Sequence, residues 1–257
     1  MNRNFSPPGY ANVLTAARDC GYDIRPLRDA FKAGAASTLL LRHDVDLSLR
    51  LALEMAQLEH ECGVTSTYHI LPHNDFYAPF SPDGRRILVR MIELGHEIGL
   101  HCDAAVYPQE PAAYLRAVGR DIETLEEITG RKVASASQHR PVEGGPVDLG
   151  NLIDVEAYAP RVREKFSYIS DSAMSWRGVT PWDLLPSRKN LQLLIHPVWW
   201  MAPGTSRKEK FEYLKKDEME LQGTRLDGEL AYIEQCLVDR EMLDARMARQ
   251  WRERAAQ

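Results

Sequence analysis

The sequence has little of several features that would assign it to particular classes of protein. It holds only four cysteines, with no Cys-x-x-Cys pair among them: Cys20, Cys62, Cys102 and Cys236. This scarcity argues against a disulfide framework and predicts reduced thiols. The net charge of −5 is too small to indicate a nucleic-acid partner.

Long apolar runs are also missing. No run approaches the ~20 residues needed to cross a bilayer, so no membrane span is expected. Residues 1–8 lack the apolar core of a signal peptide. Together these absences predict a cytoplasmic protein.

What is present fits one large α/β domain over residues 1–257. Apolar residues make up 44% and charged residues 27% of the chain, as in ordinary globular proteins. From about residue 206 the sequence is charged and helical, with apolar side chains recurring on one face: Leu226, Leu230, Ile233 and Leu237. We expect this extension to pack on its own domain or, alternatively, to form a dimer contact.

One strand carries the most informative pattern. The apolar run Leu39–Leu41 ends in a histidine and two carboxylates, His43, Asp44 and Asp46, and an amphipathic helix over 47–62 follows. Enzymes of the α/β class present ligands and bases in this way, at the carboxyl ends of their strands. Other predicted strands also end in polar residues: His101, Arg140, Asp171 and His196. Five such strand ends predict one shared rim.

Each of these residues also has a structural interpretation. Asp44 and Asp46 share a face of the strand, yet Asp46 could simply cap the following helix. His101 and His196 could be core histidines, and Arg140 with Asp171 a buried ion pair. Trp199 and Trp200, beside His196, fit a wall that stacks on a sugar as well as ordinary packing.

Taken together, the motifs resemble those of the polysaccharide deacetylases, the chitooligosaccharide-deacetylase-type carbohydrate esterases, over about residues 39–200. An acidic pair that closes a strand, His43-Asp44-Val45-Asp46, matches the first motif. The remaining four occur in the family's order: Gly95–His101, His139-Arg140-Pro141, Asp171 to Trp176, and Leu194-Ile195-His196. This shared order makes the match more specific than any single motif.

The resemblance implies a distorted (β/α) barrel and a divalent metal, zinc being the one expected. By analogy Asp44 is the base, Asp46 and His101 are ligands, and His196 is the general acid. Arg140 and Asp171 would support the base. In such a site the metal polarises an amide carbonyl, Asp44 takes a proton from water, and His196 protonates the leaving amine.

One position departs from the family. Its second motif has a further histidine four residues after the first, where this chain has Ala105. A substituted ligand is the first explanation, with His139, then His73, then His43 as candidates. Weak metal binding or a lost activity are the others.

We therefore predict a metal-dependent deacetylase that hydrolyses the N-acyl amide of an amino sugar. The expected substrate is a soluble precursor, carried on a nucleotide or a lipid, in surface-polysaccharide synthesis. Trp199, Trp200, Tyr68 and His73 are the candidate substrate-binding residues. The alternatives are a carbohydrate-binding barrel without metal and an O-acyl esterase.

Overall fold

The computed structural model describes residues 3–32, 37–140 and 148–255, in two compact units, Met1–Arg207 and Lys208–Gln257. The first unit contains an eight-stranded sheet in which all pairs of neighbouring strands are parallel. The strands are β1 (Asp23–Arg25), β2 (Thr38–Val45), β3 (Thr67–Ile70), β4 (Glu97–Cys102), β5 (Ser135–Gln138), β6 (Val155–Glu156), β7 (Ser167–Ser170) and β8 (Leu191–Ile195).

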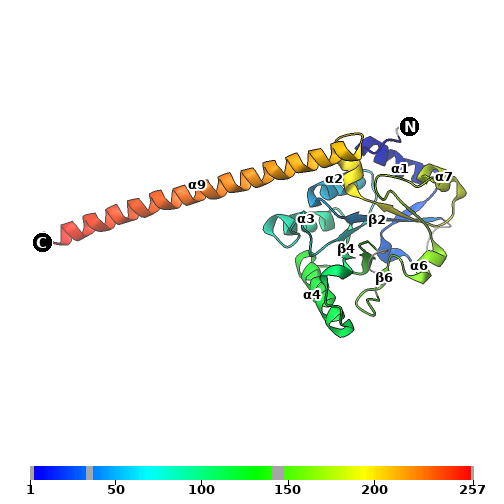
Figure 1. Cartoon of the computed structure of the whole chain (residues 1–257), viewed down its shortest axis with the longest axis horizontal. Coiled ribbons are helices and arrows are strands. Elements are labelled where there is room, and N and C mark those ends of the chain that lie inside the picture. Colours follow the sequence, from blue (N-terminus) through cyan, green and yellow to red (C-terminus); the bar gives the residue numbers. More distant parts are fainter. Residues whose placement is uncertain (1–2, 33–36, 141–147, 256–257) are drawn as a thin grey trace. The chain divides into compact units, whose positions relative to one another are not determined.

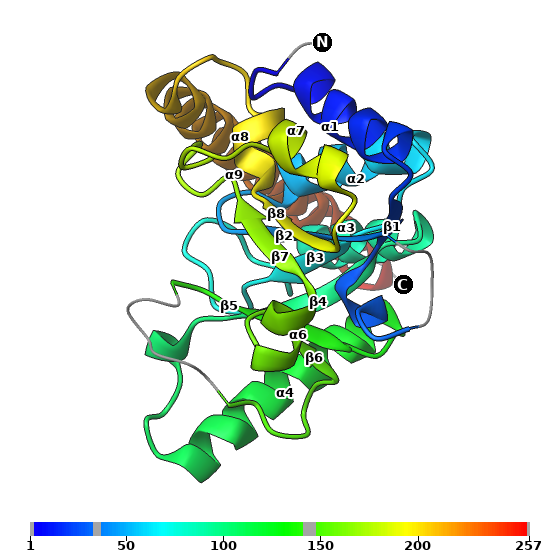
Figure 2. The same cartoon turned by 90° about the vertical axis from the view of Figure 1, so that its right-hand side faces the viewer.

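The strand order is β6-β5-β4-β3-β2-β8-β7, with β1 pairing with the first half of β2. Within the described residues no pairing joins β7 to β6, so the curled sheet stays open there. Helices surround it (Figures 1 and 2): α1 (Pro7–Asp19), α2 (Leu49–Glu61), α3 (Pro82–Glu93), α4 (Pro111–Thr129), α6 (Pro160–Lys165), α7 (Pro181–Leu184) and α8 (Pro197–Met201). Three short 3₁₀ segments span Leu27–Asp29, Ala104–Val106 and Leu185–Ser187. This architecture confirms the predicted distorted (β/α) barrel.

Alternation along β2 divides its side chains between two environments. Leu40, Arg42 and Asp44 face the interior of the barrel, and all eight residues of β2 are buried. Leu40 belongs to an apolar cluster that fills the interior near the amino ends of the strands, with Leu27, Ala30, Val155, Ala157, Val162 and Phe166. The polar residues follow towards the carboxyl end. Apolar packing thus fills the interior near the amino ends of the strands, and polar side chains occupy the interior near their carboxyl ends.

The sequence predicted most elements, with two kinds of error. Helix α4 has the predicted bounds and ends at Gly130, whose φ of 62° is the left-handed conformation that favours glycine. In the described part of the stretch 8–36, expected to be helical, the α-helix Pro7–Asp19 is followed by β1 and by the short 3₁₀ segment Leu27–Asp29. The short β6 was not predicted. Both strands have three residues or fewer, too short for a period to show in the sequence.

We expect Gly99→Ala to destabilise the barrel by about 1–3 kcal/mol. A Cβ atom at Gly99 would lie 2.5 Å from His69 Cδ2 and 2.9 Å from the Ser135 carbonyl oxygen. The matched control is Gly119→Ala in α4, where the nearest atom to the new Cβ is 3.8 Å away. That change should stabilise the helix by about 0.5–1 kcal/mol. Urea unfolding of both variants measures the difference, and equal midpoints would contradict the prediction.

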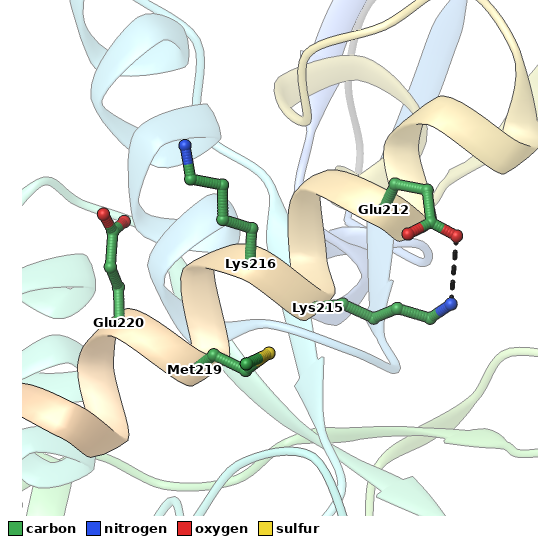
Figure 3. A pocket seen from close by; sticks show the side chains of 5 residues that line it. All are labelled: Glu212, Lys215, Lys216, Met219 and Glu220. Atoms are coloured by element: carbon green, nitrogen blue, oxygen red, sulfur yellow. Dashed lines mark hydrogen bonds and ion pairs between the residues drawn. The ribbon is translucent and has the colours of Figure 1, made fainter.

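The second unit is formed by α9 (Arg207–Ala255), the predicted helical extension. Its expected apolar face is exposed: Leu226 by 69%, Leu230 by 55%, Ile233 by 47% and Leu237 by 58%. A shallow hollow between neighbouring turns of α9 is lined by Glu212, Lys215, Lys216, Met219 and Glu220 (Figure 3), with Lys215 Nζ 3.0 Å from Glu212 Oε1. No described helix is long and apolar enough to cross a membrane. The single domain and the dimer contact stay predictions.

Candidate active site

The interior carboxylate at the end of β2 is held by three strands. Arg42 Nη1 lies 2.6 Å from Asp44 Oδ1 and 2.6 Å from Ser137 Oγ on β5. Ser137 in turn donates to Asp44 Oδ2 at 3.0 Å, and His69 Nδ1 on β3 is 3.3 Å from Asp44 Oδ1. Asp44 is 3% exposed. Its carboxylate therefore has a fixed orientation.

The charge on Asp44 follows from these neighbours. Burial alone would raise the pKa of its carboxyl, but the positive charge of Arg42 holds that pKa well below its usual range, with a smaller contribution from the nearby His101 ring. Burial lowers the pKa of His69 to about 4, so this ring is neutral at pH 7. Asp44 is thus an ionised carboxylate that can accept a proton.

Three metal-ligating side chains converge beside Asp44. The ligand atoms of Asp46, His101 and His139 all lie within 4.8 Å of one another. Asp46 Oδ1 is 3.3 Å from His101 Nε2 and 3.4 Å from His139 Nδ1, and these two nitrogens are 3.1 Å apart. His101 Nδ1 donates to the Ser137 carbonyl oxygen at 2.9 Å, which leaves Nε2 as the ligating nitrogen.

These residues fit a divalent cation. Asp46 Oδ1 is buried and has no hydrogen-bond partner, so an acceptor is left unsatisfied at the centre of the group. Burial would raise the pKa of Asp46, but the nearby rings of His101 and His139 lower it, which keeps the carboxylate ionised. Two imidazoles and one carboxylate form a common ligand set for zinc and similar metals.

The alternative role of Asp46 as a helix cap does not hold. Ser48 is the cap of α2, because its Oγ accepts from the backbone N–H of Leu51 at 3.3 Å. The carboxylate of Asp46 therefore remains available to the histidines.

A histidine and a second aspartate complete the site. His196 follows β8, and its Nδ1 lies 2.6 Å from Asp171 Oδ1 after β7. Asp171 also accepts from the indole N–H of Trp200 at 2.7 Å. His196 Nε2 faces the metal-ligand group, 3.9 Å from Asp46 Oδ2. Burial opposes the charge of the ring, but Asp171 raises the pKa of His196 to about 9, so the ring is protonated at neutral pH.

Several predicted roles need correction. Arg140 is exposed, with a φ of 46°, and the guanidinium that contacts Asp44 comes from Arg42. Pro141 of the same motif lies outside the described residues. Asp171 contacts His196 rather than the base, because both residues follow neighbouring strands. The proposed ion pair of Arg140 with Asp171 is replaced by this carboxylate–histidine pair.

Three of the candidate substrate-binding residues, Tyr68, Trp199 and Trp200, are buried. Tyr68 is fully buried on the outer face of β3, where its hydroxyl donates to Glu59 at 2.9 Å. Trp200 is fully buried on α8, and Trp199 beside it is 9% exposed. The tryptophans therefore pack rather than form an open stacking wall, and Trp200 orients Asp171.

The structure distinguishes between the three histidines that could replace the missing ligand. Only His139 lies with Asp46 and His101. The side chain of His73 is bonded to Asp121 on α4, with Nε2 3.0 Å from Oδ2. His43 points to the opposite face of β2 and pairs with Glu59. Ala105 is exposed in the turn after β4.

Arg42, His69 and Ser137 belong to the site but were not singled out from the sequence. Arg42 shares a strand face with Asp44, two residues away, and this spacing could have identified it. The other two lie on strands adjacent to known site residues, but their contacts depend on the sheet register. A short periodic strand gives no direct information about that register.

The fold and the site thus define a parallel half-barrel with an ionised carboxylate, a protonated histidine and a potential metal site at one rim. Among solved structures, the chain is similar to a family 4 carbohydrate esterase from Bacillus anthracis, at 18% identity and a TM-score of 0.41, over 83% of this chain and 86% of that one. It is also similar to peptidoglycan deacetylase PdaC from Bacillus subtilis, at 17% identity and a TM-score of 0.44, over 76% and 95%.

A pseudoenzyme of the same carbohydrate esterase family, from Bacillus anthracis, is 14% identical with a TM-score of 0.41, over 70% of this chain and 60% of that one. No protein-family model matches the sequence, and a comparison with curated proteins finds no match.

Proposed function

We propose that this protein is a divergent polysaccharide deacetylase that hydrolyses the N-acyl amide of an amino sugar. One observation carries the proposal: the buried, unsatisfied Oδ1 of Asp46 lies between two histidine nitrogens, next to a carboxylate base and a protonated histidine.

Asp46, His101 and His139 would hold the divalent cation, with zinc as the expected metal and His139 in place of the ligand missing at Ala105. When bound, such a cation polarises the acyl carbonyl and lowers the pKa of water. The hydrogen bond from His101 Nδ1 to the Ser137 carbonyl oxygen fixes the tautomer of His101 and leaves its Nε2 available for the cation.

Asp44 would act as the general base. Its carboxylate is ionised, lies 3.9 Å from His101 Nε2, and is oriented by Arg42, Ser137 and His69. It would accept the proton that water loses on attacking the acyl carbon. Arg42 holds the carboxylate in place and stabilises its negative charge until the proton arrives.

His196 would act as the general acid. Its ring carries a proton at neutral pH because Asp171 stabilises the imidazolium. Its Nε2 faces the same rim as Asp44 and Asp46, so it can protonate the departing amine nitrogen. Base and acid thus have opposite charges at the same pH, as amide hydrolysis requires.

The substrate would be a small acylated amino sugar, free or carried on a nucleotide or a lipid, as in the synthesis of surface polysaccharides. Release of acetate from N-acetylated amino sugars by the zinc-loaded protein tests this directly. Release only from O-acetylated sugars would make the protein an O-acyl esterase. Purified protein that binds no stoichiometric metal at neutral pH would favour the carbohydrate-binding barrel instead.

A further inference from the structure

The residue before the base has its side chain on the opposite face of β2. His43 is fully buried between the sheet and α2, and its strand partner on β8 is Ile195. Asp44 directly follows His43, and His196 directly follows Ile195. This pair is the final register position shared by β2 and β8, so any shift in it moves the base and the acid relative to each other.

The ring of His43 connects two hydrogen-bond acceptors. Nδ1 lies 3.3 Å from the carbonyl oxygen of Ile195, and Nε2 lies 2.8 Å from Glu59 Oε1 on α2. A carbonyl oxygen and a carboxylate can only accept. A ring nitrogen that meets either oxygen must therefore donate to it, so His43 connects the carboxyl end of β8 to α2.

The carboxylate of Glu59 is held in place by several hydrogen bonds. It is fully buried and accepts hydrogen bonds from Ser66 Oγ at 2.6 Å, from Tyr68 OH at 2.9 Å and from Tyr10 OH. Burial would raise the pKa of Glu59, but His43 brings it down to about 2. Several partners in a low-dielectric interior leave this carboxylate little freedom to move.

From this geometry we infer that His43 and Glu59 are positioning residues, which set the separation of Asp44 and His196 from behind the sheet. Neither side chain faces the barrel's interior, so neither meets the substrate. The catalytic consequence rests on the proposed function, because it takes Asp44 as base and His196 as acid. The structural consequence is that His43 holds the carboxyl ends of β2 and β8 in place, and it does not depend on the proposed function.

The test replaces His43 with phenylalanine, which keeps the packing against Tyr68, whose ring centroid lies 4.5 Å from that of His43, and removes both hydrogen bonds. We expect kcat to fall ~10–100-fold, with KM and metal content unchanged, because small misplacements of reacting groups cost this much. Hydrogen exchange of the backbone amides at Asp44, Val45 and His196 should become faster. In His43→Asn the side-chain amide can still donate to the Ile195 carbonyl oxygen, so the kcat of this variant should lie between those of His43→Phe and the parent protein.

His60→Phe is the matched control. His60 is the next residue after Glu59, and its Nδ1 also donates to a backbone carbonyl, that of Leu94 at 3.0 Å, which follows α3 rather than β2 or β8. It should leave kcat and the exchange of the three amides as in the parent protein. Equal losses of kcat in His43→Phe and His60→Phe, or unchanged amide exchange in both His43 variants, would overturn the inference. If the parent protein had no hydrolytic activity, the proposed function would be wrong. Amide exchange would still test whether His43 holds the ends of β2 and β8 together.

Discussion

Asp46→Ala should abolish hydrolysis and leave the purified protein without stoichiometric metal. Asp46 would supply the only carboxylate of the three ligands found among the described residues, and its Oδ1 is the buried atom without a hydrogen-bond partner. The loss of activity should exceed the ~10²–10⁴-fold effect of removing one acid–base group. Metal analysis after dialysis, combined with single-turnover hydrolysis, measures both effects.

The variant should remain folded, and it could gain thermal stability in the absence of metal, because an unsatisfied buried oxygen is removed. Asp75→Ala is the control, since this carboxylate is exposed on the loop after β3. His139→Ala should behave like Asp46→Ala. If it kept full metal content while Asp46→Ala lost it, His139 would not be the substituted ligand.

Removing His196, the proposed general acid, should have the second large effect. We expect His196→Gln to lower kcat ~10²–10⁴-fold, because the leaving amine then departs without a proton. Its metal content should stay close to that of the parent protein. A comparable loss of metal would show that His196 is a ligand rather than an acid.

The pH profile of Asp171→Asn provides the companion measurement. Activity requires His196 to be protonated, and Asp171 raises the pKa of this ring to about 9. The neutral amide no longer stabilises the imidazolium, so the ring loses its proton at a lower pH. The alkaline limb of kcat/KM should therefore move towards neutral pH, whereas the acidic limb, governed by Asp44, should stay in place. An unmoved alkaline limb would contradict the assignment of His196.

The sequence predicted the residues at the rim more reliably than the partners of each residue. Asp44, Asp46, His101 and His196 follow strands whose apolar residues mark them clearly, and parallel strands bring their carboxyl ends to one edge of the sheet. His139 was found by asking which histidine could replace the one missing at Ala105. These inferences need only the chain order and the strand ends.

Which residues contact each other depends on the direction in which each side chain points. Arg140 was expected to support the base because it matches the arginine of the third motif, yet it is exposed after β5, and Arg42 makes the contact with Asp44. Trp200 was a candidate for stacking on a sugar, yet it is fully buried on α8, where its ring lies against Phe5, Tyr10 and Trp176. Such orientations follow from tertiary packing, which a local pattern does not encode.

The pairing of Arg42 with Asp44 has a consequence for how this protein can change. The proposed base and its counter-ion are two residues apart on one face of one strand, and their contact depends on β2 rather than on Arg140 after β5. We therefore expect substitutions of Arg140 to leave the proposed proton acceptor with its electrostatic partner.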